Sequence, residues 1–320
     1  MPRTARLDSP GLLQHVIFRG VDRCDIFHDD ADRRKFLRNL SKLLIQIDVE
    51  CFAWSLMTSH VHLLLRPRRS RLASFMRRLL TAYALYFNRR HQRSGHLFQG
   101  RYKSIVCEED GYLLELVRYI HLNPLRAGLV SELAALAAYP WCGHSIILGN
   151  GVLEGQVVDE VLGLFGKNRG VAIRHYSRFI ADGVKQGKRD DLSSSGRRRT
   201  NRAEDGYDER ILGSKSFIEE LRTRQDLKDE LAAPIDLDDL IDRVFVRYGV
   251  NPAALRPKTR VAGIAEVRSV VCYLGVRHLE RSGVEVGRRL GLSRSGVSVA
   301  AGRGEQLVKD DPTLLSLIDK

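Results

Sequence analysis

Two histidines separated by a single residue are the first feature of this chain whose type and spacing could do chemistry. His60 and His62 lie in the run Trp54–Leu65, whose apolar residues are typical of a buried β-strand. Side chains at positions i and i+2 of a strand point to the same face of a sheet, so one metal ion could bind both imidazoles. The pair alone is weak evidence, because such histidines are more often ordinary polar residues at a sheet surface.

A tyrosine and an asparagine further along the chain would complete such a site. Residues 111–123 repeat apolar side chains with helical period, and Pro124 disfavours helical geometry at the residue before it. Tyr119 and Asn123 are four residues apart and therefore share one face of the last turn. Packed against the histidine strand, this face would supply a phenol nucleophile and an oxygen ligand, which suits phosphodiester cleavage through a covalent phosphotyrosine. The alternative is structural: a half-buried core tyrosine and a helix-end asparagine.

At these residues the chain resembles the single-tyrosine HUH transposases, and among them the REP-associated tyrosine transposases. The resemblance lies within residues 1–145 and rests on four separated segments in the same order, residues 14–20, 57–65, 95–103 and 119–128. Thr58 and Ser59 stand where family members often carry Pro-Asn. This departure affects the entry to the strand and removes no ligand.

The resemblance assigns a role to each residue of the candidate site. It implies that His60 and His62 are metal ligands, that Asn123 is the third ligand and that Tyr119 is the nucleophile. It also implies a divalent Mg2+ or Mn2+ ion, with which two imidazoles and an oxygen donor are compatible, whereas zinc is poorer for this chemistry. The implied substrate is single-stranded DNA near a hairpin from repetitive extragenic palindromes.

The charge of the chain indicates a nucleic-acid partner independently. The net charge is +13, and no acidic residue occurs between Cys51 and Cys107. A basic stretch without counter-charges is the pattern expected of a surface that binds a phosphate backbone, although solvated arginine faces are common. The predicted DNA contacts in this stretch are Arg66, Arg68, Arg69, Arg77, Arg78, Arg89, Arg90, Arg101 and Lys103.

Length and composition limit the class of protein. The 320 residues suffice for two modest domains, and 43% hydrophobic residues is ordinary for a soluble protein. No apolar stretch approaches the roughly twenty residues that span a bilayer, and no signal-peptide pattern is present, so we expect a cytoplasmic, nucleoid-associated bacterial protein with no membrane partner, either monomer or homodimer. The five cysteines form no CxxC pair, which argues against a disulfide framework or a cysteine zinc site.

The first part of the chain alternates between strand and helix patterns. We expect strands at residues 12–19, 49–57, 60–66 and 104–109, and helices at 30–47, 72–90 and 110–123. The middle two strands meet at a short turn and are predicted to form an antiparallel hairpin. This order predicts an α+β fold, a ferredoxin-like antiparallel sheet with its helices on one face, and places the histidines on or beside a central strand.

Three segments are predicted along the whole chain. Residues 1–185 form the catalytic domain, which helices at 157–166 and 171–183 complete. Residues 186–234 are polar, basic and contain glycine and serine, as a mostly flexible linker would. Residues 235–320 form a small all-α domain that includes helices at 237–248 and 261–281.

The small domain contains the pattern of a helix-turn-helix. A short helix is followed by a turn at Gly291-Leu292 and by Ser293, which is suited to cap a second helix. The segment resembles the origin-binding C-terminal domain of the bacterial replication initiator DnaA. That resemblance implies that DNA is contacted by Arg288, Arg289, Arg294 and Ser295. Two helices joined by a glycine turn are also common in packed bundles, and three glycines, at 296, 302 and 304, weaken the second helix.

Together these features predict a metal-dependent single-stranded DNA endonuclease and strand transferase. It would be a HUH transposase that acts through a covalent 5'-phosphotyrosine at palindromic hairpins, with an added module that binds duplex DNA. Two alternatives remain open. One is a sequence-specific DNA-binding regulator whose nuclease site is silent, and the other is a rolling-circle replication initiator, which shares the chemistry and differs in substrate.

Overall fold

The computed structural model of the chain contains two compact units, residues 6–231 and residues 232–320. The structure describes residues 6–187, 189, 192, 208–231, 236–251, 263–279 and 281–318. Among these residues, no helix combines the length and the apolar character that a membrane span requires.

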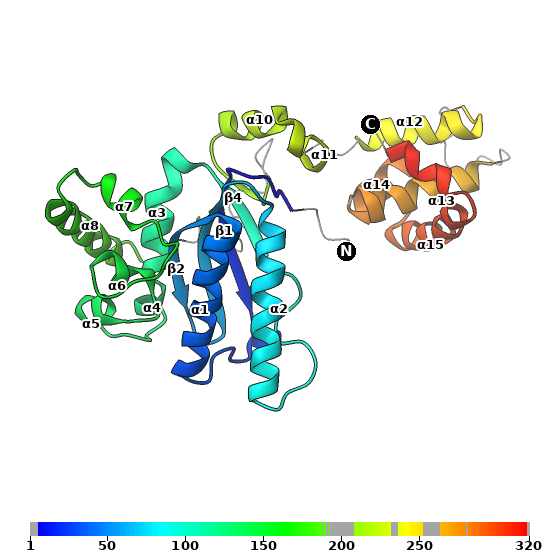
Figure 1. Ribbon diagram of the computed structural model, residues 1–320. Coiled ribbons are helices and arrows are strands. Elements are labelled where there is room, and N and C mark those ends of the chain that lie inside the picture. The colour runs from blue at the N-terminus through cyan, green and yellow to red at the C-terminus, as the bar shows by residue number, and fades with distance from the viewer. Residues whose placement is uncertain are drawn as a thin grey trace. The chain divides into compact units, whose positions relative to one another are not determined.

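A five-stranded sheet forms the centre of the first unit (Figure 1). Its elements follow in the order β1 (Leu13–Arg19), α1 (Asp30–Ile47), β2 (Val49–Leu56), β3 (His60–Pro67), α2 (Leu72–Arg90), β4 (Lys103–Cys107) and α3 (Glu109–His121), with a 3-10 turn at Val21–Arg23. The strands lie in the order β2-β3-β1-β4-β5, where β5 (Ile211–Leu212) pairs parallel to β4 and all other neighbours are antiparallel. The α+β class, the β-α-β-β-α-β order and the β2–β3 hairpin agree with the prediction.

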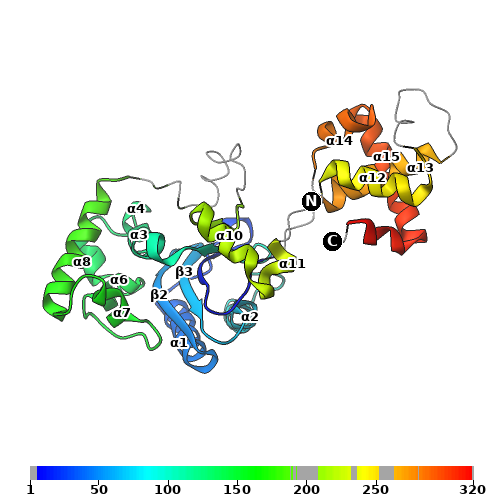
Figure 2. The ribbon, with the colours of Figure 1, turned by 90° about the horizontal axis from the view of Figure 1, so that it is seen from above.

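The helices cover both faces of the sheet, whereas the sequence predicted a single helical layer. On one face α1 and α2 lie side by side over Leu63 and Leu65 (Figure 1). On the other face α3 packs over Leu64 and Ile105, and Figure 2 shows α3 across the sheet from α1 and α2. Successive strand residues point to opposite faces, so a strand that is apolar at every position needs cover on both.

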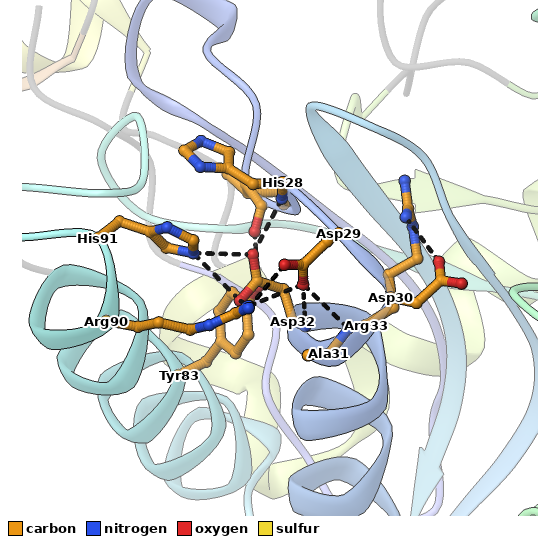
Figure 3. Close-up of polar contacts among 10 residues, drawn as sticks. His28, Asp29, Asp30, Ala31, Asp32, Arg33, Tyr83, Arg90 and His91 are labelled. Atoms are coloured by element: carbon orange, nitrogen blue, oxygen red, sulfur yellow. Dashed lines mark hydrogen bonds and ion pairs between the residues drawn. The ribbon is translucent and has the colours of Figure 1, made fainter.

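A buried carboxylate joins the start of α1 to the end of α2 (Figure 3). Asp29 caps α1 by accepting hydrogen bonds from the first backbone N–H groups of the helix. The Asp32 carboxylate is fully buried and lies 2.5 Å from Arg90 Nη1 and 2.9 Å from His91 Nε2. It also accepts a hydrogen bond from the backbone N–H of His28 at 2.9 Å. Arg90, predicted to contact DNA, therefore holds two helices together.

Further helices complete the first unit beside α3. They are α4 (Asn123–Arg126), α5 (Leu133–Ala138), α6 (Gly143–Ile147), α7 (Val158–Gly163) and α8 (Arg169–Val184). The predicted helices at 157–166 and 171–183 correspond to α7 and α8. Residues Val161 and Tyr176 of these helices lie in the same core as Leu116 and Ile120 of α3, so this segment holds α3 against the sheet.

Part of the predicted linker over 186–234 is folded. The segment 208–231 contains β5, α10 (Lys215–Thr223), a 3-10 turn at Gln225–Leu227 and α11 (Lys228–Leu231). Its apolar residues Leu221 and Leu227 pack with Leu12 and Val106. Without β5 the edge of β4 would expose unpaired backbone groups, which is the physical reason for this cover. The rest of the predicted linker lies outside the described residues, namely 188, 190, 191, 193–207 and 232–234.

The described residues of the second unit are helical, as predicted. The elements are α12 (Leu237–Tyr248), α13 (Ile264–Tyr273) with a π turn at Leu274–His278, α14 (Gly283–Leu290), α15 (Arg294–Asp310) and a 3-10 stretch at Pro312–Ile318. Gly291 ends α14 with a φ of 66°, and Ser293 caps α15 by accepting from the Gly296 N–H at 3.1 Å. Despite its glycines, α15 is 17 residues long. A Cβ at Gly304 would come within 2.0 Å of the Ser269 carbonyl oxygen, so glycine there allows α15 to cross α13 closely.

Candidate active site

The register of the sheet places the two predicted histidines on one face. In the β1–β3 pair, His60 lies opposite Arg19 and His62 lies opposite Ile17. The centroids of the two imidazole rings are 5.2 Å apart. The prediction that both rings share a face is therefore confirmed, on a strand that has neighbours on both sides.

A third histidine, His15, joins the pair from the neighbouring strand β1. Its Nε2 atom lies 3.1 Å from His62 Nδ1, and the two rings stack with their centroids 5.3 Å apart. His15 is two residues before Ile17, the partner of His62, so its side chain lies on the same face of the sheet. The sequence allows His15, like His91, His96 and His121, to lie near DNA or the metal, but only the strand pairing places it beside His62.

The tyrosine helix packs against these histidines, as the sequence predicted. The ring of Tyr119, on α3, meets His15 edge to face at 5.8 Å and His62 at 5.9 Å between centroids. Tyr119 is half-buried at the margin of the second core. Its ring therefore lies beside the imidazoles while part of the side chain stays open to solvent.

Asn123 lies one turn beyond Tyr119, although the helix does not end at Pro124 as predicted. Helix α3 ends at His121, Leu122 keeps right-handed helical backbone angles, and Pro124 occupies the first turn of α4. Proline fits the first turn of a helix because its missing N–H would have no partner there. The side-chain nitrogen of Asn123 is buried without a hydrogen-bond partner among the described residues.

Burial keeps the imidazoles neutral. Burial, with a smaller effect of Arg19, lowers the pKa of His60 to about 4. Burial lowers the pKa of His62 well below its ordinary value, and His15, His60 and Arg19 lower it further. A neutral imidazole has the lone pair that a metal requires, so both histidines are in the ligating form at neutral pH.

The donor set fits a divalent cation. It consists of two neutral imidazoles and one amide. No three His, Cys, Asp or Glu side chains among the described residues form a group suited to a metal. The amide of Asn123 can be rotated so that its oxygen takes the place of the unpartnered nitrogen, because the two atoms are nearly indistinguishable in shape. Two nitrogens and one carbonyl oxygen leave coordination positions for water or phosphate oxygens.

Residues 9–123 match the family model described as "Transposase IS200 like". This segment of the first unit is therefore similar to the IS200-like transposases. The match includes both histidines of β3 and ends at Asn123, so all four predicted site residues lie inside it.

Two solved structures are similar to the chain. One is described as a REP-associated tyrosine transposase bound to a REP hairpin; it is 16% identical, and the match covers 48% of this chain and 90% of that chain with a TM-score of 0.39. The other is a proposed transposase from Deinococcus radiodurans R1; it is 23% identical, and the match covers 36% of this chain and 92% of that chain with a TM-score of 0.25. Comparison with curated protein sequences gives no match.

Several arginines of the first unit that were predicted to contact DNA form ion pairs with acidic residues. Arg66 contacts Glu50 at 2.7 Å, Glu109 at 2.5 Å and Glu160 at 2.7 Å. Arg68 also pairs with Glu50, Arg69 with Asp48, and Arg90 with Asp29 and Asp32. The stretch between Cys51 and Cys107 therefore has counter-charges after all, supplied by acidic residues that folding brings to it. The remaining predicted contacts of this stretch are exposed: Arg77, Arg78, Arg89, Arg101 and Lys103.

Two cations beside the candidate site were not among the predicted site residues. Arg19, exposed at the end of β1, lies on the histidine face opposite His60. The guanidinium carbon of Arg126 lies 5.8 Å from the centre of the Tyr119 ring, and Nη2 of Arg126 donates to the Gly183 carbonyl at 3.3 Å. Both would attract a phosphate to this face, and apart from their charge nothing in the sequence distinguishes them from other arginines.

The predicted DNA contacts of the second unit lie around the α14–α15 turn. Arg288, Arg294 and Ser295 are exposed. Arg289 pairs with Asp238 at 3.0 Å, so part of its charge is already balanced within the unit.

Proposed function

We propose that this protein nicks single-stranded DNA and transfers the cut strand through a covalent bond between Tyr119 and a 5' phosphate. The observation that supports this most directly is the contact of the Tyr119 ring with His62, beside which His60 lies on the same face. The phenol of α3 thus lies beside two neutral imidazoles of β3, within the segment that matches the IS200-like transposase model.

The chain's own residues account for the steps of cleavage. Tyr119 Oη attacks the phosphorus atom and gives its proton to solvent, an Oη–P bond forms, and the bond from phosphorus to the 3' oxygen breaks as that oxygen takes up a proton. Joining is the reverse step, in which a 3' hydroxyl attacks the phosphotyrosine and releases Tyr119. Mg2+ or Mn2+ held by His60, His62 and Asn123 would polarise the scissile phosphate and offset its developing charge.

The DNA that we propose as substrate is a single strand next to a hairpin from a repetitive extragenic palindrome, as the resemblance to REP-associated tyrosine transposases implies. The second unit would add affinity for duplex DNA. The support for this is the capped α15 helix, which follows a three-residue turn and has exposed side chains at Arg288, Arg294 and Ser295.

The proposal is tested by trapping the covalent complex. Full-length protein is incubated with end-labelled single-stranded hairpin oligonucleotides and Mg2+ or Mn2+, and SDS-resistant complexes are separated on a gel. We expect an adduct with the parent protein and none with Tyr119→Phe. Tyr112→Phe is the matched control, since Tyr112 lies on α3 outside the histidine contacts and should leave the adduct unchanged. An undiminished adduct with Tyr119→Phe would refute the assignment of the nucleophile.

A further inference from the structure

A groove lies beside the edge strand β2, and it has no role in the proposed cleavage step. It has a volume of about 850 Å3 and lies between helix α1 and the segment from Pro140 to Glu154. This segment falls outside the part of the chain that matches the transposase family. Helix α1 covers the face of the sheet opposite to α3, so the groove is not part of the site around Tyr119.

One wall of the groove carries three cations. Arg34, Arg38 and Lys42 are spaced four residues apart on α1 and therefore follow one another along a single helix face. No ion pair among the described residues involves any of the three. Glu154 is the single acidic residue in the lining. In contrast to the paired arginines after Cys51, these cations are available to an anionic ligand.

The rest of the lining is apolar. Leu37, Ile146 and Leu153 line the groove between the walls. At its margins Ile45 and Val152 are 60% and 85% exposed, which is unusual for large apolar side chains. A duplex presents its phosphates to such a surface and keeps its bases stacked inside, whereas a single strand also offers the apolar faces of sugars and bases. Cations beside apolar contacts therefore favour a single strand.

The Pro140 end of the groove lies beside the end of β2, which pairs with the start of the histidine strand β3. Its outer wall follows β2, because the backbone N–H groups of Cys51 and Leu56 donate to the carbonyls of Gly155 at 3.0 Å and Trp141 at 2.9 Å. Leu56, at the Trp141 end, pairs with Val61, which lies between the two histidines. A single strand of DNA that leaves the histidine face around this end of the sheet would pass along the α1 cations from Arg34 to Lys42.

We propose that this groove binds a single-stranded segment of the DNA substrate, next to the nucleotides that reach Tyr119. The location rests on the proposed function, because it takes Tyr119 as the cleavage site. The phosphates of the segment would contact Arg34, Arg38 and Lys42, and its sugars and bases would cover Ile45 and Val152. The groove thus holds the strand during turnover without taking part in bond breaking.

The test compares two variants that lose the same charge. The double variant Arg38→Gln with Lys42→Gln removes two cations from the groove. The double variant Arg174→Gln with Arg178→Gln removes two cations at the same spacing from the surface of α8. Binding of a fluorescein-labelled oligothymidine and of a blunt duplex to the full chain is measured by fluorescence anisotropy over a series of salt concentrations.

We expect the groove variant to bind oligothymidine about tenfold more weakly in low salt. The slope of its log affinity against log salt should fall by about 1.4, since each phosphate contact on a single strand contributes about 0.7. Its affinity for the duplex should equal that of the parent. The α8 variant should bind both oligothymidine and duplex as tightly as the parent does. Equal losses of oligothymidine affinity in both variants would mean that only net charge acts, and would overturn the proposal. A loss of affinity confined to duplex would also overturn it. So would competition by polyglutamate as strong as that by unlabelled oligothymidine.

A second readout separates this proposal from the proposed function. At subsaturating DNA, the groove variant should form less Tyr119 adduct than the parent, and the deficit should shrink as the DNA concentration rises. If no protein forms an adduct while the groove variant alone loses oligothymidine binding, the proposed cleavage is wrong and the groove assignment stands. If adducts form and oligothymidine binding does not differ between the two variants, the groove assignment is wrong and the cleavage stands.

Discussion

His15 Nε2 lies 3.1 Å from His62 Nδ1, in a contact between strands β1 and β3. For His62 to bind a metal through Nε2, its Nδ1 must carry the proton and donate it to His15. A hydrogen bond of this kind fixes both the tautomer and the orientation of a ligating imidazole. His15 is thus suited to position His62 rather than to contact the substrate itself.

Replacing His15 by Phe keeps a ring in the stack and removes the acceptor. We expect Mn2+ affinity to fall by about ten- to a hundredfold, the usual effect of losing such a partner, while His15→Gln, which restores an acceptor, recovers part of it. Titration of free Mn2+ by electron paramagnetic resonance measures this without any need for activity. His175→Phe, at an exposed position on α8, is the control. An unchanged Mn2+ affinity in His15→Phe would mean that the contact between His15 and His62 contributes packing only.

Replacing either histidine of β3 by Ala should separate cleavage from binding. Cleavage should fall by orders of magnitude because an inner ligand is lost, while affinity for single-stranded DNA, which depends on the arginines, should largely persist. Asn123→Ala should have a smaller effect, since water can replace an oxygen ligand. Adduct yields and anisotropy on the same oligonucleotide measure both properties, and a parallel loss of the two in His60→Ala would indicate a structural role.

Asp32→Asn should destabilise the first unit by about 2–3 kcal/mol at neutral pH, because hydrogen bonds to a charged group are lost in a buried setting. Burial alone would raise the pKa of Asp32, but its contacts with His28, Arg90 and His91 outweigh this effect and lower it. Since the folded pKa is the lower one, the stabilisation is present above the ordinary pKa of about 3.9 and is lost as pH falls through the folded value.

Urea titration followed by tryptophan fluorescence reports on this unit alone, because both tryptophans, Trp54 and Trp141, lie in its core. The difference between parent and Asp32→Asn should shrink as the pH is lowered below about 4. Asp30→Asn, at an exposed position of the same helix turn, should change stability by less than about 0.5 kcal/mol. A difference that stays constant down to acid pH would contradict the charged state of Asp32.

A fragment of residues 6–231 should fold and form the Tyr119 adduct, whereas one ending at residue 185 should aggregate. The shorter fragment lacks β5 and leaves Val106 and the edge of β4 uncovered. Size-exclusion chromatography and circular dichroism of both fragments measure the difference. If the shorter fragment is monomeric and equally stable to urea, the segment 208–231 is dispensable and the boundary predicted from the sequence is adequate.

A fragment of residues 232–320 should bind duplex DNA without cutting it, with affinity that falls steeply as salt rises. Arg294→Gln should weaken this binding, while Arg243→Gln, on α12, should not. Anisotropy with a labelled duplex provides the measurement. The absence of any duplex affinity at low salt would assign these helices to packing or dimerisation.

The local elements of this protein were predictable from the sequence because hydrophobic period and capping act over a few residues. Helix α1 begins after the cap Asp29, and α15 begins after Ser293, where the pattern places them. The spacing of His60 and His62 likewise fixes a shared face on any strand. The residue types of the candidate site and the order of the elements therefore follow from the chain itself.

The neighbours of these residues were decided only by the tertiary structure. The partnership of His15 with His62 depends on which strand pairs with β3, and the pairing of Arg66 with Glu109 and Glu160 depends on contacts far apart in the sequence. The same long-range packing pairs several arginines after Cys51 with acidic residues, whereas Arg34 and Arg38 beside the groove have no ion pair within the described part of the chain. Sequence spacing sets the directions of side chains, but strand order and packing set the distances between them.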